Sequence, residues 1–68
     1  MEKAQKRLIK NLKSLLEMNK KSMDKVGLES NFSKGTLSKI ISGKMNPSLE
    51  TLEKIAEYFE IDITDLFK

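Results

Sequence analysis

The chain has 68 residues, no cysteine and no histidine, and 34% of its residues are charged. This length predicts a single domain, residues 1–68, with one small core. The missing cysteine and histidine exclude disulfides and the commonest metal ligands, so we expect no metal and no cofactor. No apolar run approaches the roughly 18 residues of a membrane span, and the N-terminus lacks the apolar region of a secretory signal. We therefore expect a cytoplasmic protein without membrane contact.

The charges are divided unevenly along the chain. Residues 1–48 hold 11 basic and 4 acidic residues, whereas residues 49–68 hold 2 basic and 6 acidic residues. A polarised chain of this kind suits binding to a polyanion, although solvated helix faces would give the same composition. On charge alone, solvated helix faces are the favoured interpretation.

Apolar residues at helical spacing predict two helices in the first half of the chain. The first covers about residues 3–19, and its apolar arc consists of Ala4, Leu8, Ile9, Leu12, Leu15 and Leu16. The second begins after Ser22, a good N-cap, and continues to about Glu29. Asn31 is predicted to end it, because asparagine tolerates the left-handed conformation of a tight helix exit.

Three more helices are predicted in the second half. Ser33 is expected to cap a third helix over about 33–42, which Gly43 ends. Pro47 prevents its continuation, and Ser48 caps a fourth helix with the buried stripe Leu49, Leu52, Ile55, Ala56 and Phe59. Asp62 caps a short fifth helix, with Asp65 in a capping-box position. Since no segment alternates like a strand, the expected fold is an all-α, compact five-helix bundle.

The second and third helices, joined by the four residues SNFS, predict a helix-turn-helix in which the third helix enters the major groove of DNA. On a helical wheel, Leu37, Ile40 and Ile41 face the core. The opposite side carries the candidate base contacts Lys34, Gly35, Thr36, Ser38 and Lys39. Hydroxyls, amides and lysines near the helix ends are the candidate phosphate contacts, namely Ser22, Ser33, Ser42, Lys44 and Asn46. The glycine either lets the backbone approach DNA closely or is a neutral surface residue.

The run FSKGTLSKIISGKMNPSLETLEKIAEYFEIDITDLF resembles the phage-repressor-like helix-turn-helix family, the type of lambda-like repressors and Cro proteins. The resemblance covers about residues 8–67. It implies a five-helix domain of the lambda-repressor-like type, operator binding by the third helix and frequent dimerisation on two half-sites. Met23 stands where the family usually has a glutamine that contacts phosphate, so it belongs with the phosphate positions although its side chain cannot hydrogen-bond there.

Three further positions differ from the family pattern. Many relatives pair an arginine in the first helix with a glutamate near the end of the third, and Leu16 and Ile41 occupy these positions here. Both charges are absent together, and replacement of a buried ion pair by apolar residues is often neutral or stabilising. Gly27 stands where the family usually has alanine, which costs up to about 1 kcal/mol of helix propensity.

The sequence therefore favours a transcription regulator that binds a double-stranded DNA operator sequence-specifically, with repression as the favoured activity. We expect a homodimer, at least on DNA, with an interface near Ile63 and Phe67. The alternative is a small helical protein-interaction adaptor or antitoxin module of the same fold. An enzyme is not expected, because no nucleophile–base pair can be assembled from these residues.

Overall fold

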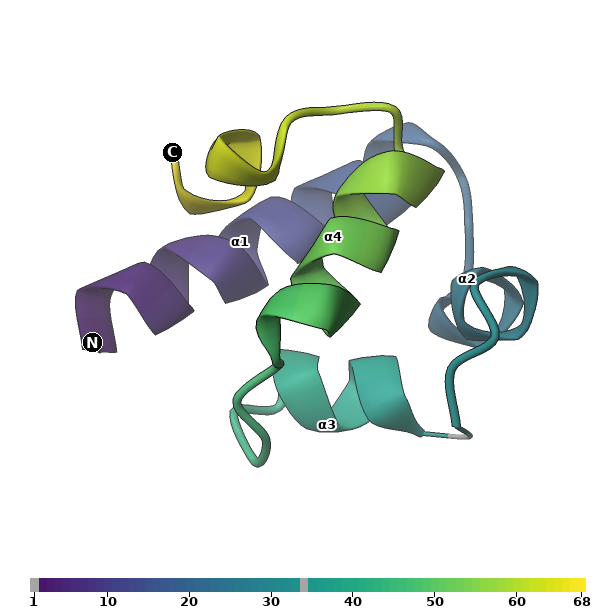
Figure 1. The fold of residues 1–68 in the computed structure, drawn as a ribbon, viewed down its shortest axis with the longest axis horizontal. Helices are drawn as coiled ribbons and strands as arrows, with labels where there is room; N and C mark the ends of the chain where they lie inside the picture. Colours follow the sequence, from purple (N-terminus) through teal and green to yellow (C-terminus); the bar gives the residue numbers. More distant parts are fainter. Residues whose placement is uncertain (1, 34) are drawn as a thin grey trace.

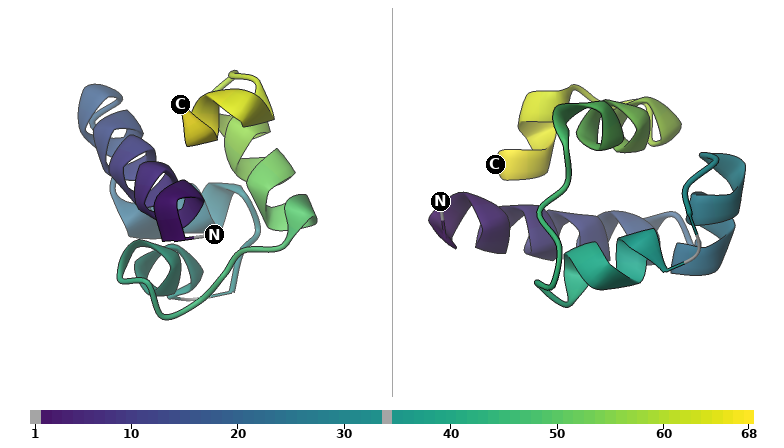
Figure 2. Two further views of the ribbon diagram at one scale, coloured as in Figure 1. Left: turned by 90° about the vertical axis from the view of Figure 1, so that its left-hand side faces the viewer. Right: turned by 60° about the horizontal axis from the view of Figure 1, so that its bottom comes forward.

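The computed structural model describes residues 2–33 and 35–68, and within them it contains four α-helices, one 3-10 helix and no strand. The elements are α1 (Glu2–Met18), α2 (Met23–Glu29), α3 (Thr36–Ile41), α4 (Leu49–Tyr58) and the 3-10 helix η1 (Ile63–Phe67). In Figures 1 and 2, α3 and η1 lie on opposite sides of α1, and α2 lies beside α3. The all-helical class is confirmed.

One cluster of buried side chains joins all five elements. It consists of Leu8, Leu12, Val26, Leu37, Ile40, Leu52, Ile55, Ala56 and Leu66. The predicted apolar arc of α1 is only partly buried, because Ala4 is exposed and Ile9, Leu15 and Leu16 are half-buried. In the predicted buried stripe of α4, Leu49 is in fact 65% exposed, and Phe59 is half-buried and packs against the outside of the cluster.

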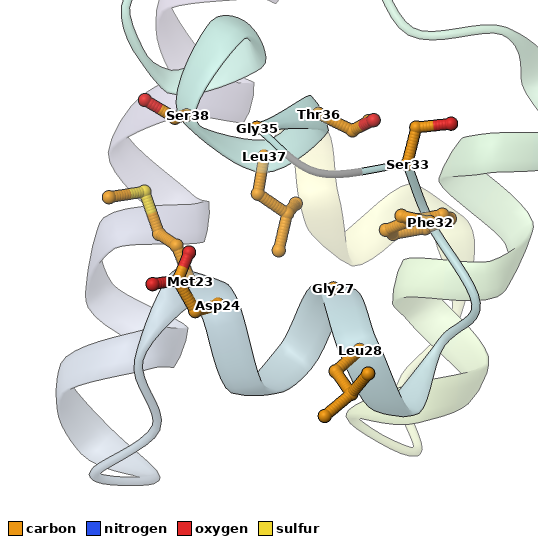
Figure 3. A pocket seen from close by; sticks show the side chains of 10 residues that line it. All are labelled: Met23, Asp24, Gly27, Leu28, Phe32, Ser33, Gly35, Thr36, Leu37 and Ser38. Carbon is orange, nitrogen blue, oxygen red and sulfur yellow. The ribbon is translucent and has the colours of Figure 1, made fainter.

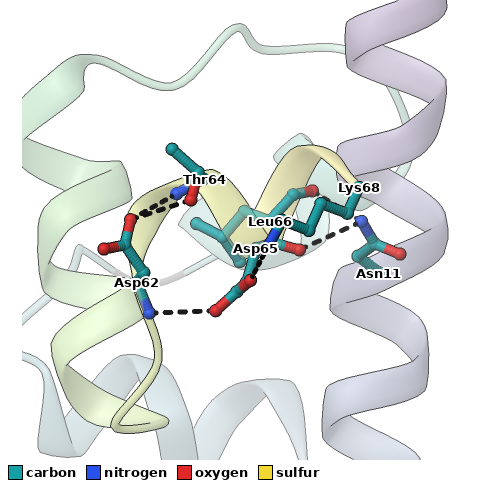
Figure 4. Close-up of polar contacts among 6 residues, drawn as sticks. All are labelled: Asn11, Asp62, Thr64, Asp65, Leu66 and Lys68. Atoms are coloured by element: carbon teal, nitrogen blue, oxygen red, sulfur yellow. Dashed lines mark hydrogen bonds and ion pairs between the residues drawn. The ribbon is translucent and has the colours of Figure 1, made fainter.

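Three of the predicted helix starts are confirmed by capping hydrogen bonds. The Ser22 hydroxyl accepts from the Lys25 N–H at 3.1 Å, and the Ser48 hydroxyl accepts from the Thr51 N–H at 3.2 Å. Asp62 accepts from the Thr64 N–H at 3.0 Å, while the Asp65 carboxylate accepts from the Asp62 N–H at 3.2 Å (Figure 4). This last pair is a reciprocal capping box.

The predicted start of the third helix is wrong. Ser33 does not cap it; α3 begins at Thr36, its N-cap is Gly35, and no side chain caps it. Gly35 has φ +81°, a left-handed conformation that turns the chain sharply just before the first helical residue. The Ser33 carbonyl, rather than its hydroxyl, accepts from the Thr36 N–H at 3.1 Å. The helix expected over 33–42 is therefore shorter, with Ser42 as its C-cap.

Each α-helix is followed by a residue in the left-handed conformation. These residues are Lys20 (φ 52°), Asn31 (φ 60°), Gly43 (φ 81°) and Glu60 (φ 57°). At each exit, two backbone N–H groups bond to carbonyls of the last turn, such as Glu60 N–H to Glu57 and Ile61 N–H to Ala56. This is the Schellman arrangement. The prediction for Asn31 is confirmed, and the same backbone turn recurs at three other exits.

The fifth predicted helix is a 3-10 helix of five residues, so the described chain has four α-helices and the expected count of five is not confirmed. The Asn11 amide of α1 donates to the Leu66 carbonyl at 2.8 Å and holds this segment against α1 (Figure 4). Leu66 itself is fully buried. No helix in the described part of the chain is both long and apolar enough to cross a membrane.

Candidate nucleic-acid interface

The orientation of α3 is fixed by the apolar side chains that it shares with α2 and α1. Leu37 and Ile40 are 3% and 1% exposed, and Val26 of α2 is fully buried in the same cluster. Because a helix places successive residues about 100° apart, burial of the Leu37 and Ile40 side chains turns Ser38 and Lys39 outward. Both are exposed.

The candidate base contacts differ in how they are presented. Ser38 and Lys39 are exposed, whereas Thr36 and Gly35 at the start of α3 are half-buried. Lys34 lies outside the described residues. Of the described candidates, Ser38 and Lys39 therefore have side chains that project farthest into solvent.

An open depression of about 360 Å³ lies between α2 and α3. It is lined by Met23, Asp24, Gly27, Leu28, Phe32, Ser33, Gly35, Thr36, Leu37 and Ser38 (Figure 3). Leu37 points from α3 toward α2, whereas the Ser38 hydroxyl points away from the gap. The structure thus brings five of the predicted contact residues, from both helices of the motif, to one surface.

The candidate phosphate contacts form two groups at the ends of the motif. Ser22 and Met23 lie at the start of α2; the serine is exposed and the methionine is 38% exposed. Ser42, Lys44 and Asn46 follow α3 and are also exposed. Ser33 is exposed and lies in the turn between α2 and α3, before α3 begins.

The hydroxyls of the two flanking serines already take part in local hydrogen bonds. The Ser22 hydroxyl accepts from the Lys25 N–H, and the Ser42 hydroxyl donates to the Lys39 carbonyl at 3.1 Å. Ser22 keeps its O–H free to donate, whereas Ser42 would have to exchange its bond for one to a phosphate. Ser22 is therefore the better placed donor of the two.

Sequence reasoning missed two features of this surface. Asp24 adds a carboxylate to the depression between α2 and α3, next to the exposed Met23. Leu28 of α2 is 79% exposed at the rim of the same depression. A helical wheel of α2 is the one sequence signal that could have placed this leucine on the outside. A helix of seven residues contains too few turns for its apolar face to be assigned from that wheel alone.

On the far side of α2, contacts with α4 brace the motif. The Tyr58 hydroxyl donates to the Glu29 carboxylate, and the Lys54 ammonium lies 5.9 Å from the centre of the Phe32 ring. The hydrogen bond lowers the pKa of Glu29 and raises the pKa of Tyr58. These contacts connect the last turn of α2 and the turn before α3 to the fourth helix.

The two residues predicted for a dimer interface serve partly in the fold itself. Ile63 and Phe67 of η1 are half-buried and pack against the core cluster. Only their outer surfaces remain for a partner. η1 also lies on the side of α1 opposite α3, so a partner bound there would leave the surface of α3 open (Figure 2).

Two short helices joined by a turn, the second of them buried on one side and polar on the other, have the arrangement of a helix-turn-helix. The family model described as helix-turn-helix matches residues 12–66. The chain therefore belongs to this family of DNA-binding regulatory domains, which includes the lambda repressor and Cro type. No curated protein and no solved structure is significantly similar to the chain.

Proposed function

We propose that this protein is a transcription regulator, with repression as the favoured activity. In this proposal it binds a double-stranded DNA operator sequence-specifically, as a homodimer, and α3 lies in the major groove. Ser38 and Lys39 contact base edges, where lysine can donate to guanine O6 and N7 and serine can address several bases. Thr36 and the backbone at Gly35 approach the same groove, and the proposal extends to Lys34, which precedes them in sequence.

The observation that carries this proposal is the separation of the two sides of α3. Leu37 and Ile40 are almost completely buried, while Ser38 and Lys39 are exposed on a helix of the family's recognition motif. A hydroxyl and an ammonium on a rigid helix can donate hydrogen bonds to base edges. Ser22 at the start of α2 and Lys44 in the turn after α3 supply phosphate contacts that would fix the register.

A second candidate function is a helical adaptor that binds another protein through the same motif. The exposed Leu28 and Met23 beside the depression between α2 and α3 favour it, because apolar surface is typical of protein interfaces. The carboxylate of Asp24 in this depression repels a phosphate and also suits an adaptor. The exposed Lys39 on α3 and Lys44 in the turn after it argue for DNA instead, and we place the regulator first.

Selection of bound duplexes from a random DNA pool tests the proposal. The wild-type protein should enrich one motif, with two half-sites about one helical turn apart if the bound form is a dimer. Enrichment of no motif, together with weak binding to every duplex, would contradict sequence-specific binding and favour the adaptor.

The double variant Ser38→Ala/Lys39→Ala identifies the surface responsible for selection. It should lose the motif while keeping its helical circular dichroism, because neither side chain is part of the core. Lys3→Ala at the start of α1 is the matched control, since it also removes one exposed lysine but lies outside α2, α3 and the turn between them. Retention of the motif by the double variant would show that another surface reads the bases.

A further inference from the structure

Beside α3 lies a second open depression, of about 480 Å³, formed with α1 and the turn between α1 and α2. Its floor is apolar and consists of Leu16, Met23 and Ile41. Its charged lining residues are Lys13, Glu17, Lys20 and Lys21.

The floor therefore has no side-chain group that can hydrogen-bond a phosphate, and the lysines at the rim provide the charge instead. Lys13 and Lys20 are exposed, and Lys21 is half-buried. The salt bridges between described residues join Lys54 to Glu50 and Lys68 to Asp65, so none of them uses these three lysines. The lining of this depression thus holds three lysines and one carboxylate, Glu17.

Two of the lysines are carried by a well-defined turn. The Lys20 N–H bonds to the Glu17 carbonyl at 3.2 Å, and the Lys21 N–H bonds to the Leu16 carbonyl at 2.9 Å. A turn fixed in this way loses little conformational freedom when it binds a ligand. Lys21 also acts on the far side of α2, where its charge is one of the influences that lower the pKa of Glu29.

The depression is continuous with the predicted DNA surface. Met23 lines both this depression and the one between α2 and α3, and Ile41 is the last residue of α3, directly before Ser42. A DNA strand that passes the start of α2 and the end of α3 would therefore pass the lysine rim as well. Backbone phosphates are the groups on DNA that attract lysine without regard to sequence.

We propose that Lys13, Lys20 and Lys21 form an additional phosphate-binding site for the DNA backbone beside α3. The site rests on the proposed DNA binding and adds to it a contact from α1 and the α1–α2 turn. Its charge compensates for the missing hydrogen bond at Met23. It contributes affinity and salt dependence and leaves the choice of sequence to α3.

The test uses the triple variant Lys13→Gln/Lys20→Gln/Lys21→Gln. Its matched control is Lys3→Gln/Lys6→Gln/Arg7→Gln, which removes the same net charge at exposed positions of α1 that lie outside the depression and take part in neither of the two salt bridges between described residues. Affinity for the selected duplex and for a random duplex of equal length is measured over about 50 to 200 mM salt. Circular dichroism and thermal melting establish that each variant is folded.

The triple variant of Lys13, Lys20 and Lys21 should bind both duplexes more weakly than the wild type, by the same factor. It should also reduce the magnitude of the slope of log affinity against log salt by about two to three units. The control should lower the slope much less. Equal slopes for the two variants would overturn the site, while wild-type binding would still support the DNA-binding function. Failure of the wild-type protein to bind any duplex would overturn both. If the triple variant does not fold, the single variant Lys13→Gln should lower the slope by about one unit, and an unchanged slope would overturn the site.

Discussion

Gly27 is half-buried in α2 beside the depression that faces α3. A Cβ atom built on it meets no heavy atom within 4 Å, so an added methyl group has space. Gly27→Ala should therefore stabilise the protein by up to about 1 kcal/mol, because alanine favours the helix and restricts the unfolded chain. The melting temperature should rise by roughly 4 to 8 °C per kcal/mol in a domain of this size.

Gly43→Ala is the matched control for this substitution. Its Cβ also meets nothing within 4 Å, but Gly43 has φ +81°, which an alanine adopts only with strain. It should lower the melting temperature. A fall in melting temperature for Gly27→Ala as well would show that the backbone of α2 needs glycine for a reason other than space.

Individual capping residues show how far single positions can be predicted. Ser22, Ser48 and Asp62 are polar residues directly before helical patterns, and all three cap helices. Ser33 has the same local signal but is not a cap, because Gly35 adopts φ +81° two residues later and delays the start of α3. A glycine permits this conformation without requiring it, so the sequence alone does not fix the helix start.

The turn that follows α4 contains a residue in the left-handed conformation that is not glycine. Glu60 has φ 57° and lies in the Schellman turn after this helix. Glu60→Gly should stabilise the protein by about 1 kcal/mol, because glycine adopts this conformation without a Cβ penalty. Thermal melting or urea unfolding measures the effect.

The same change within α4 should have the opposite sign. Glu53 is exposed in the middle of the helix, and Glu53→Gly should cost about 0.5 to 1 kcal/mol of stability. Loss of stability in both variants would indicate that Glu60 contributes through its side chain and that its backbone strain is small.

The contact between α2 and α4 should make part of the stability depend on pH. Hydrogen bonding to Tyr58 lowers the pKa of Glu29 in the folded protein, so this stabilisation is complete above the usual glutamate pKa of about 4.3. It is lost as the pH falls through the lower, folded-state value. The difference in melting temperature between the wild type and Tyr58→Phe should therefore be larger at about pH 7 than at about pH 3.

The opposite limit of this pH range is set by the tyrosine itself. Hydrogen bonding to the Glu29 carboxylate raises the pKa of Tyr58 in the folded protein. The stabilisation from this bond is therefore present below the usual tyrosine pKa of about 10, and it is lost as the pH rises through the higher pKa of Tyr58 in the folded protein. A difference between the two proteins that is constant from neutral to acid pH would show that the hydrogen bond does not couple to the Glu29 carboxylate.

The elements themselves were largely predictable, and the exceptions have physical causes. The long apolar arc of α1 and the stripe of α4 each fill several turns, so their periodicity is clear. The segment Ile63–Phe67 has only five residues, and its 3-10 form is held by the Asp62–Asp65 capping box and by Asn11 from α1. That contact joins residues more than fifty positions apart, which no local pattern reveals.

For the molecule as a whole, the small size of α3 bears on the assembly that binds DNA. α3 has six residues, and its exposed side chains can contact only a few base pairs. We therefore expect two chains on each selected duplex, related by a two-fold axis. Sedimentation of the protein with the selected duplex should give two chains per duplex at saturation. A limit of one chain per duplex, with footprinting that protects a single half-site, would contradict the dimer.

The candidate site could be predicted in outline because the polar side of α3 alternates with buried Leu37 and Ile40 along the sequence. The position of Lys13 and Lys20 relative to α3 could not. Both lie in a lysine-rich stretch that is typical of a solvated helix face, and only the packing of α1 against α3 brings them to one depression with Ile41. The packing of whole helices against each other therefore brings lysines to the surface beside α3 that the pattern of a single helix does not place there.

The most direct test of DNA reading by α3 compares Lys39→Ala with Lys44→Ala on the selected duplex and on random duplexes. Lys39→Ala should cost about 1 to 3 kcal/mol on the selected duplex and much less on random ones. Lys44→Ala should weaken all duplexes by a common factor and lower the salt slope by about one unit. Equal losses on both kinds of duplex for Lys39→Ala would contradict base reading by this residue, and no change in either variant would place the adaptor ahead of the regulator.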